Sequence, residues 1–175
     1  NLWRLPGIFP TLDNEVLAAK FFISMERQNF IDHCRNNRVN VNIELIDKYC
    51  VFLGSLATDD LQGAFDMCNV VGNISDLESF SNNYMEAWLT GRPILASDRE
   101  FSRQICGDSA IYVDPHDPAS LLKGIRRFAS GDFNLATLTS AAASALDGLP
   151  TRDERLAMLA RIIERRGVPV PDMKS

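Results

Sequence analysis

The sequence predicts an α/β domain with a doubly wound, Rossmann-like parallel sheet and helices on both of its faces. Short apolar runs that are typical of strands alternate along the chain with segments of helical periodicity. Such alternation favours parallel strands joined by right-handed crossovers. The chain has 175 residues, of which 46% are hydrophobic, and this is enough for one domain with a full core. We therefore expect residues 1–167 to form one domain and residues 168–175 to form a Pro-containing tail.

Composition and charge exclude several classes of function. The net charge of −5 disfavours a general affinity for nucleic acid. No apolar run reaches the roughly 18 residues of a membrane span. The four cysteines are scattered and predict reduced thiols in an intracellular, cytoplasmic protein. With two histidines and no metal-like cysteine spacing, we expect no metal site and no cofactor.

The first third of the chain predicts strands and helices in alternation. Thr11 or Asp13 is the expected cap of a long helix. A strand closed by Gly54 precedes a helix capped by Thr58, whose apolar residues recur at helical spacing. In chain order, the predicted elements are an edge strand at 8–9, a helix at 14–35, a weak strand at 39–43, a strand at 49–53 and a helix at 58–68.

The rest of the chain continues this alternation with clearer boundary signals. Asp117 with Pro118 marks a helix start, and Thr151 with Glu154 forms a capping box. We expect His116 at the surface. The predicted elements are strands at 69–75, 94–97 and 110–113, and helices from 81 to about 90, at 100–106, at 118–129, at 134–146 and from 152 onward.

The most informative stretch runs from Glu78 to Trp88. Two carboxylates, Glu78 and Glu86, bracket seven residues. Ser81 is the expected N-cap of a helix that has Glu78 just before it and Glu86 in its early turns. In an open parallel sheet, ligands bind at the carboxyl ends of the strands. A helix that begins there offers free N–H groups and a favourable dipole to an anion. Nearby, Asp98 and Arg99 are expected to close a turn or to pair with each other.

This stretch and its surroundings resemble the family 4 glycosyltransferases of the GT-B fold. The likeness covers about residues 49–129, and the order of the motifs along the chain is more specific than the two glutamates alone. The segments that carry it are 52–56, 78–80, 86–87, 91–98, 107–110 and 113–115.

The resemblance implies one half of a GT-B fold, the C-terminal nucleotide-sugar-binding half of a retaining hexosyltransferase. It implies a nucleotide-diphosphate sugar as the substrate and a hydroxyl acceptor in polysaccharide or glycolipid synthesis. Glu78 would be the catalytic residue that faces the sugar, Glu86 would hold the ribose and Leu56 would meet the base. The residues that would wrap the sugar and the diphosphate are Ser79, Phe80, Ser81, Asn82 and Asn83.

The sequence also departs from the family pattern. Ser81, Asn82 and Asn83 stand where the family has a Gly-rich loop. The family places an Arg and a Lys after the first strand of this domain, and at 10–14 we find an acid in place of the Lys. The N-terminal acceptor-binding domain, through which the enzyme would contact a membrane, is expected elsewhere, in cis or in trans.

Two alternatives to this function stay open at this point. The first is a non-catalytic α/β interaction or regulatory domain that kept the fold. The second is a sugar-nucleotide epimerase of the same overall fold, which would also need both halves.

Overall fold

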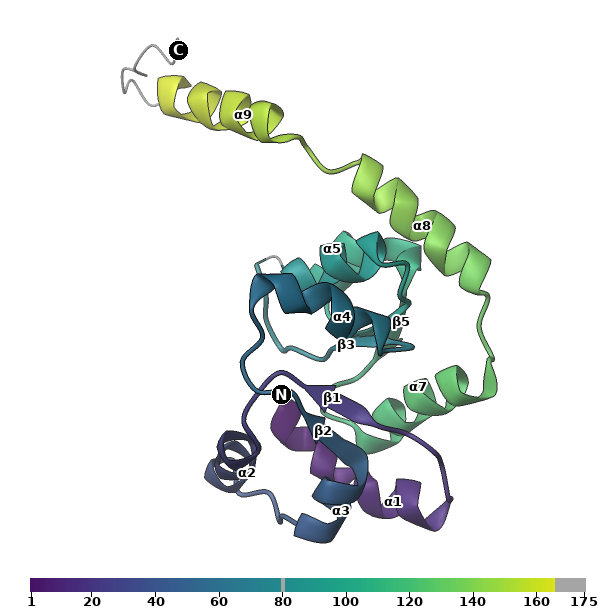
Figure 1. Cartoon of the computed structure of the whole chain (residues 1–175). Coiled ribbons are helices and arrows are strands. Elements are labelled where there is room, and N and C mark those ends of the chain that lie inside the picture. The colour runs from purple at the N-terminus through teal and green to yellow at the C-terminus, as the bar shows by residue number, and fades with distance from the viewer. Residues whose placement is uncertain (80, 166–175) are drawn as a thin grey trace.

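In the computed structural model, which describes residues 1–79 and 81–165, five short strands form two parallel sheets flanked by helices (Figure 1). One sheet pairs two strands, and the other has three strands in the order β3-β4-β5. The strands are β1 (Phe21–Ile23), β2 (Cys50–Phe52), β3 (Val71–Asn73), β4 (Ile94–Ser97) and β5 (Ala110–Val113). The predicted α/β class with parallel strands is confirmed.

Helices connect every pair of successive strands, and α9 projects away from the rest of the chain (Figure 1). Four short helical segments, η1 and α1 to α3, surround the two-stranded sheet. The helical segments are η1 (Leu2–Gly7), α1 (Phe9–Asn14), α2 (Arg27–Asn36), α3 (Ile43–Tyr49), η2 (Thr58–Asp60), α4 (Leu61–Asp66), α5 (Asn82–Leu89), α6 (Glu100–Cys106), η3 (Gly107–Ser109), α7 (Pro118–Ser130), α8 (Leu135–Asp147) and α9 (Arg152–Arg165).

The three-stranded sheet buries both of its faces, as the alternation of side chains along each strand requires. Ile94 and Ala96 of β4 pack on one face with side chains from α5 and α8. Leu95, between them, packs on the other face with α7 and the N-terminal helices. The predicted placement of helices on both faces is therefore confirmed for this sheet.

Helix α7 approaches the sheet very closely at Gly124. A Cβ atom at this position would lie 2.5 Å from Cγ1 of Val113 and 2.7 Å from Cδ1 of Leu95. Ordinary packing distances between carbon atoms are about 3.5–4.0 Å, so any side chain here would displace a neighbour. The absence of a side chain therefore sets the spacing between α7 and the sheet.

Three helices in the second half of the chain begin with a side-chain cap, and those at Asp117 and Thr151 were predicted. Asp117 accepts a hydrogen bond from the Ala119 amide of α7. Asn134 accepts one from the Thr137 amide of α8. At α9, the Thr151 amide donates to Glu154 at 2.7 Å and the Glu154 amide donates to the Thr151 hydroxyl at 3.3 Å, which is a capping box.

Several predictions for the first part of the chain are wrong. Thr11 and Asp13 lie inside α1 and cap no described helix, and Thr58 lies inside η2 and caps none either. Residues 8–9 form no strand, because α1 begins there. The long helix predicted at 14–35 is two helices with β1 between them, and the weak strand predicted at 39–43 is a loop that leads into α3. Asn42 caps α3 by accepting a hydrogen bond from the Leu45 amide at 3.2 Å.

The ends of α1 and α2 explain two of these errors. Each helix ends in a Schellman motif, in which one residue is left-handed and the next amide bonds back five residues. Val16 (φ 53°) and Arg38 (φ 60°) take the left-handed position. A β-branched residue strongly disfavours this conformation, so the sequence carries no stop signal at Val16. Pairing of β1 with β2 offsets that local preference.

The terminal helix predicted from residue 152 is present as α9, and its apolar side chains are exposed where the structure describes them. Leu156 is 37% and Leu159 is 55% exposed. The predicted tail at 168–175 lies outside the described residues. Among the described helices, none combines the length and the apolar character that a bilayer crossing needs.

Candidate functional site

A bend of residues 74–81 leaves the carboxyl end of β3 and leads into α5. Its described residues, 74–79 and 81, lie in neither strand nor helix, although the sequence predicted a strand up to residue 75. Glu78 is half-buried, and its Oε1 accepts a hydrogen bond from the Ser75 hydroxyl at 2.7 Å. Ser79 beside it is exposed. Phe80, also a predicted site residue, lies outside the described residues.

Helix α5 begins where the sequence predicts. Ser81 is its N-cap and has extended backbone angles (φ −104°, ψ 124°), although its hydroxyl caps no amide of the described helix. Asn82 and Asn83 follow in the first turn with exposed side chains. The Ser81 side chain therefore satisfies no N–H group of this turn in the described residues, and the Tyr84 amide donates to the Ser81 carbonyl at 3.2 Å.

Two aromatic residues fix α5 on the sheet, while Glu86 lies half-buried between them in the sequence. The Tyr84 hydroxyl lies 3.1 Å from the hydroxyl of Ser102, and burial raises the pKa of Tyr84. The Trp88 Nε1 group donates to the Ser109 hydroxyl at 3.0 Å. These buried contacts hold the helix that carries Glu86 in one orientation.

Leu56, the predicted contact for the base, follows β2 and is half-buried. It therefore lies next to the other sheet rather than in the bend or in α5, which carry the other predicted residues. The nearby Gly54 is left-handed (φ 68°), and a Cβ on it would lie 2.7 Å from Oε1 of Glu26. A carboxylate thus lies over the glycine at the end of β2.

The segment that follows the first strand differs from our prediction. We placed it at 10–14, but these residues belong to α1 and precede β1. The first strand is β1, and the acid after it is Glu26. The nearest cation, Arg27, donates to both carboxylate oxygens of Asp47 at 2.8 and 2.9 Å, and this hydrogen bonding raises the pKa of Arg27. No Arg–Lys pair therefore stands in residues 24–27.

The structure brings to the bend a set of charged residues that sequence reasoning missed. Asp76 faces Arg4, Arg99 and His116, and its Oδ1 lies 2.5 Å from Nε2 of His116. His116 is thus at the surface, as predicted, but it is bound to the bend. The useful signal was the position of Asp76, an acid just beyond a strand end.

Asp98 and Arg99 do not form a carboxylate–guanidinium pair with each other. Arg99 donates to the backbone carbonyl of Asp98 at 2.9 Å and to the Asp114 carboxylate at 3.2 Å. The Asp98 carboxylate accepts from Nε of Arg103 at 2.5 Å, and this bond lowers the pKa of Asp98. The prediction of a turn at this place holds, but the predicted pairing holds only through the backbone.

Two buried polar side chains lie at the carboxyl ends of adjacent strands. Asn73 ends β3 and is 5% exposed, and Ser97 ends β4 and is fully buried. Within the described part of the chain, Nδ2 of Asn73 and Oγ of Ser97 find no hydrogen-bond partner. Unpartnered buried groups of this kind are costly and are often found at functional sites.

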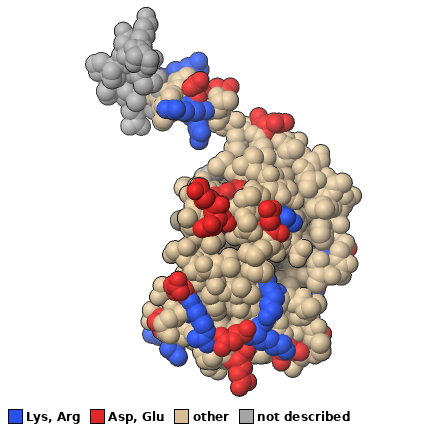
Figure 2. All heavy atoms as spheres, viewed as in Figure 1, with Lys and Arg blue, Asp and Glu red and all other residues tan. Residues whose placement is uncertain are grey.

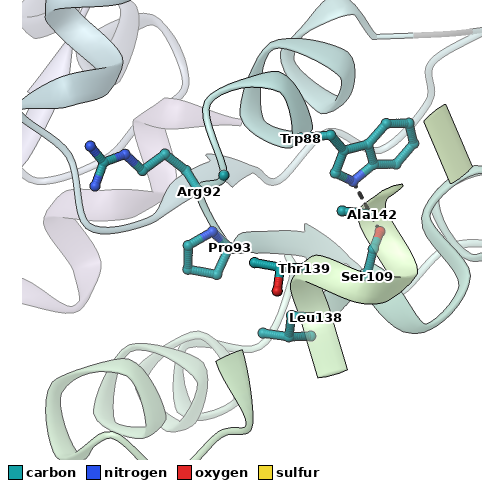
Figure 3. Close-up of a pocket in the computed structure, with 8 residues that line it drawn as sticks. Trp88, Arg92, Pro93, Ser109, Leu138, Thr139 and Ala142 are labelled. Atoms are coloured by element: carbon teal, nitrogen blue, oxygen red, sulfur yellow. Dashed lines mark hydrogen bonds between the residues drawn. The ribbon is translucent and has the colours of Figure 1, made fainter. Parts of the chain in front are cut away.

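The amino ends of the strands form the amino edge of the three-stranded sheet, opposite the carboxyl ends described above. A small cavity of about 20 Å³ lies at this amino edge (Figure 3). Trp88 and Ser109 line it next to Ala142 of α8, and Leu138 of the same helix lines it farther along. This volume has room for about one water molecule, so it is not a substrate site.

Charged side chains on the visible face of the molecule occur in both signs (Figure 2). Ion pairs in the described residues include Arg27 with Asp47 and Lys48 with Asp13. This face therefore presents no continuous basic surface of the kind that binds nucleic acid. In the described residues, no three His, Cys, Asp or Glu side chains are grouped as a metal site would require.

Residues 10–130, more than half of the chain, match the family model of the group 1 glycosyl transferases. The chain belongs to this family. In this group 1 glycosyl transferase, the matched range includes β1 to β5, the bend and α5. Comparison with curated proteins gave no significant match.

Solved structures share the fold of this group 1 glycosyl transferase at low sequence identity. Sucrose-phosphate synthase of Thermosynechococcus elongatus is 17% identical with a TM-score of 0.63, and the match covers 94% of this chain and 43% of that protein. HepE of Anabaena, in complex with UDP and glucose, is 16% identical with a TM-score of 0.63 and coverages of 95% and 46%. TarM is 15% identical with a TM-score of 0.65 and coverages of 89% and 31%.

These matches establish the fold as part of GT-B, as predicted. The chain spans less than half the length of each of the three structures.

Proposed function

We propose that this chain is the donor-binding domain of a retaining hexosyltransferase that moves a sugar from a nucleotide-diphosphate sugar to a hydroxyl acceptor. The observation that carries the proposal is the bend at the end of β3, where Glu78 and Glu86 flank the start of α5. The family match over residues 10–130 includes both glutamates and supports it.

Each role fits the chemistry of its residue. A carboxylate such as Glu86 accepts two hydroxyl hydrogen bonds, which suits a ribose diol. Glu78 would face the donor sugar, and Leu56 would meet the base. When the glycosidic bond breaks, the leaving diphosphate gains charge. The N–H groups of the first turn of α5, at Asn82 and Asn83, would therefore stabilise the transition state more than the ground state.

The transfer itself would require an acceptor-binding domain in cis or in trans. The matched structures are more than twice as long as this chain, which supports such a partner. We place the enzyme in the cytoplasm, in polysaccharide or glycolipid synthesis, with membrane contact through that other domain. The substrate is the nucleotide sugar, and the proposal uses neither a metal ion nor a cofactor.

A second candidate is a non-catalytic α/β domain that kept the fold. The observation that favours it is Glu26, a carboxylate over Gly54 at the strand ends, where the family resemblance implies cations. Arg27, which follows it, is already engaged by Asp47. A diphosphate would meet negative charge on this side of the site.

Titration of the chain with UDP and GDP separates the two candidates, and UDP is the first choice because HepE was crystallised with it. A ligand present at a hundredfold excess over its dissociation constant should raise the stability by about 2.7 kcal/mol. Glu86→Ala should weaken binding by about 10- to 100-fold, because hydrogen bonds to a charged group contribute about 1.5–3 kcal/mol.

The matched control is Glu154→Ala, which removes a carboxylate of the α9 capping box and should leave nucleotide binding unchanged. A thermal shift that Glu86→Ala abolishes would support the donor-binding role. No shift with either nucleotide would favour the non-catalytic domain.

A further inference from the structure

One carboxylate joins the bend to three other segments of the chain. Oδ1 of Asp76 lies 2.5 Å from Nε2 of His116 and 3.8 Å from Nη2 of Arg99, and Oδ2 lies 3.5 Å from Nη2 of Arg4. Arg4 comes from η1, Arg99 from the loop after β4, and His116 from the turn after β5. Asp76 therefore ties the bend to elements on both sides of it.

The partners of Asp76 are themselves braced against one another. Arg4 donates to the carbonyl of Pro115 at 2.8 Å, and its side chain is 16% exposed. Arg99 donates to Oδ1 of Asp114 at 3.2 Å, and the same oxygen accepts the His116 amide at 3.0 Å. A network whose members share partners holds one geometry better than an isolated surface pair does.

The charge state of Asp76 agrees with this arrangement. Burial acts to raise the pKa of Asp76, but hydrogen bonds from Asn1 and His116 and the charge of Arg4 outweigh it, so the pKa is lowered. The carboxylate is thus ionised at neutral pH and attracts its cationic partners.

We propose that Asp76 is a positioning residue that fixes the bend and thereby places Glu78, a role that rests on the proposed donor-binding function. Asp76 lies two residues before Glu78, in a segment without helix or strand hydrogen bonds. Such a segment depends on side-chain anchors for its order. The Ser75 hydroxyl, which bonds Glu78, directly precedes the anchor.

The consequence is a separation of two affinities. Glu86, the base contact and the first-turn N–H groups at Asn82 and Asn83 lie outside the bend, so loosening residues 74–79 should change the binding of a nucleotide diphosphate little. Glu78 would face the sugar, so the additional affinity contributed by the sugar should fall. The loss of one hydrogen bond between a carboxylate and a sugar hydroxyl corresponds to roughly 10- to 100-fold in affinity.

The test is calorimetric titration of the chain and of Asp76→Asn with UDP and UDP-glucose, or with GDP and GDP-mannose if the chain binds guanosine. We expect the Kd for the nucleotide to stay within about twofold and the Kd for the nucleotide sugar to rise by about tenfold. Amide hydrogen exchange should become faster in residues 74–79 and stay unchanged in β4. Asp76→Glu, which keeps the charge, should recover part of the sugar affinity.

The matched control is Asp66→Asn, since Asp66 is also an exposed carboxylate paired with an arginine, Arg92, at 3.5 Å. It should change neither affinity. Equal losses for both ligands in Asp76→Asn, or an unchanged ratio between them, would overturn the positioning role. If the unaltered chain binds neither nucleotide, the proposed function itself is wrong.

Discussion

The two edges of the three-stranded sheet are built on different principles. At the amino edge, buried side chains form hydrogen bonds with one another, as Trp88 does with Ser109. The cavity beside them has room for only about one water molecule. At the carboxyl edge, charges meet in a partly exposed network around Asp76, and Asn73 and Ser97 keep unpartnered buried atoms in the described chain. The amino edge is thus closed by buried hydrogen bonds, whereas the carboxyl edge holds exposed charges and buried polar atoms without a partner in the described residues.

The largest expected effect is at the amino edge. Trp88→Ala should lower the free energy of unfolding by about 3–5 kcal/mol, because it removes a large buried ring and leaves a cavity. Trp88 is 5% exposed. Urea denaturation measures the change. Asp98→Asn at the carboxyl edge should stay within about 0.5 kcal/mol. Equal losses at the two sites would remove the contrast between the edges.

A smaller loss is expected for the hydrogen bond alone. Ser109→Ala should cost about 1–3 kcal/mol, because the Trp88 Nε1 group would be buried without an acceptor. Ser109 is 2% exposed and also donates to the carbonyl of Cys106 at 2.6 Å. In a double-mutant cycle with Trp88→Phe the two losses should be less than additive. Strict additivity would show that this contact contributes nothing.

Acid should act on the carboxyl edge. The Arg103 hydrogen bond lowers the pKa of Asp98, and the His116 amide lowers that of Asp114. A lowered folded-state pKa gives stability that is present above the unfolded pKa, roughly 4, and is lost as the pH falls through the folded value. Melting curves from pH 5 to pH 2.5 should show this loss, and Asp98→Asn should reduce its slope. An unchanged slope would mean that the Arg103 pair does not contribute.

The smallest effect is expected at the Cys106 thiol of the amino edge, whose pKa burial raises to about 12. A raised folded-state pKa gives stability that is present below the unfolded value, about 8.5, and is lost as the pH rises toward 12. At pH 8 a thiol reagent should therefore label Cys106 only when the edge opens. Cys68 is half-buried and should react first, as mass spectrometry of the labelled protein would show. Similar rates would indicate an amino edge that is already open.

The sequence predicted the fold best where boundary residues act locally. Strand 94–97 and helix 100–106 have the predicted bounds, and Asp117 and Asn134 cap the predicted helices. In the first 49 residues, the left-handed Val16 and Arg38 end helices without a glycine. The predicted first helix therefore ran on through β1. The pairing of β1 with β2, which makes this segment a strand, is a non-local contact that the local sequence pattern does not report.

The candidate site was predicted as a segment but not as a network. The bend from Glu78 to Asn83 and the N-cap at Ser81 follow from residues that are neighbours in the chain. The contact of Asp76 with Arg4, Arg99 and His116 joins residues up to 112 positions apart in the printed sequence. No periodicity or spacing reports such a contact, since it arises only when three strand ends meet at one edge.

Gly124 influences the position of the charged residues at the carboxyl edge from a distance. Its bare backbone lets α7 rest directly on Val113 and Leu95, so the helix has no slack in the direction of the sheet. The same helix continues, through the turn that begins at Asp114, into the segment that holds His116. A methyl group at position 124 would push α7 away from the sheet. The turn that precedes α7 would then shift, although the methyl group contacts none of the charged residues.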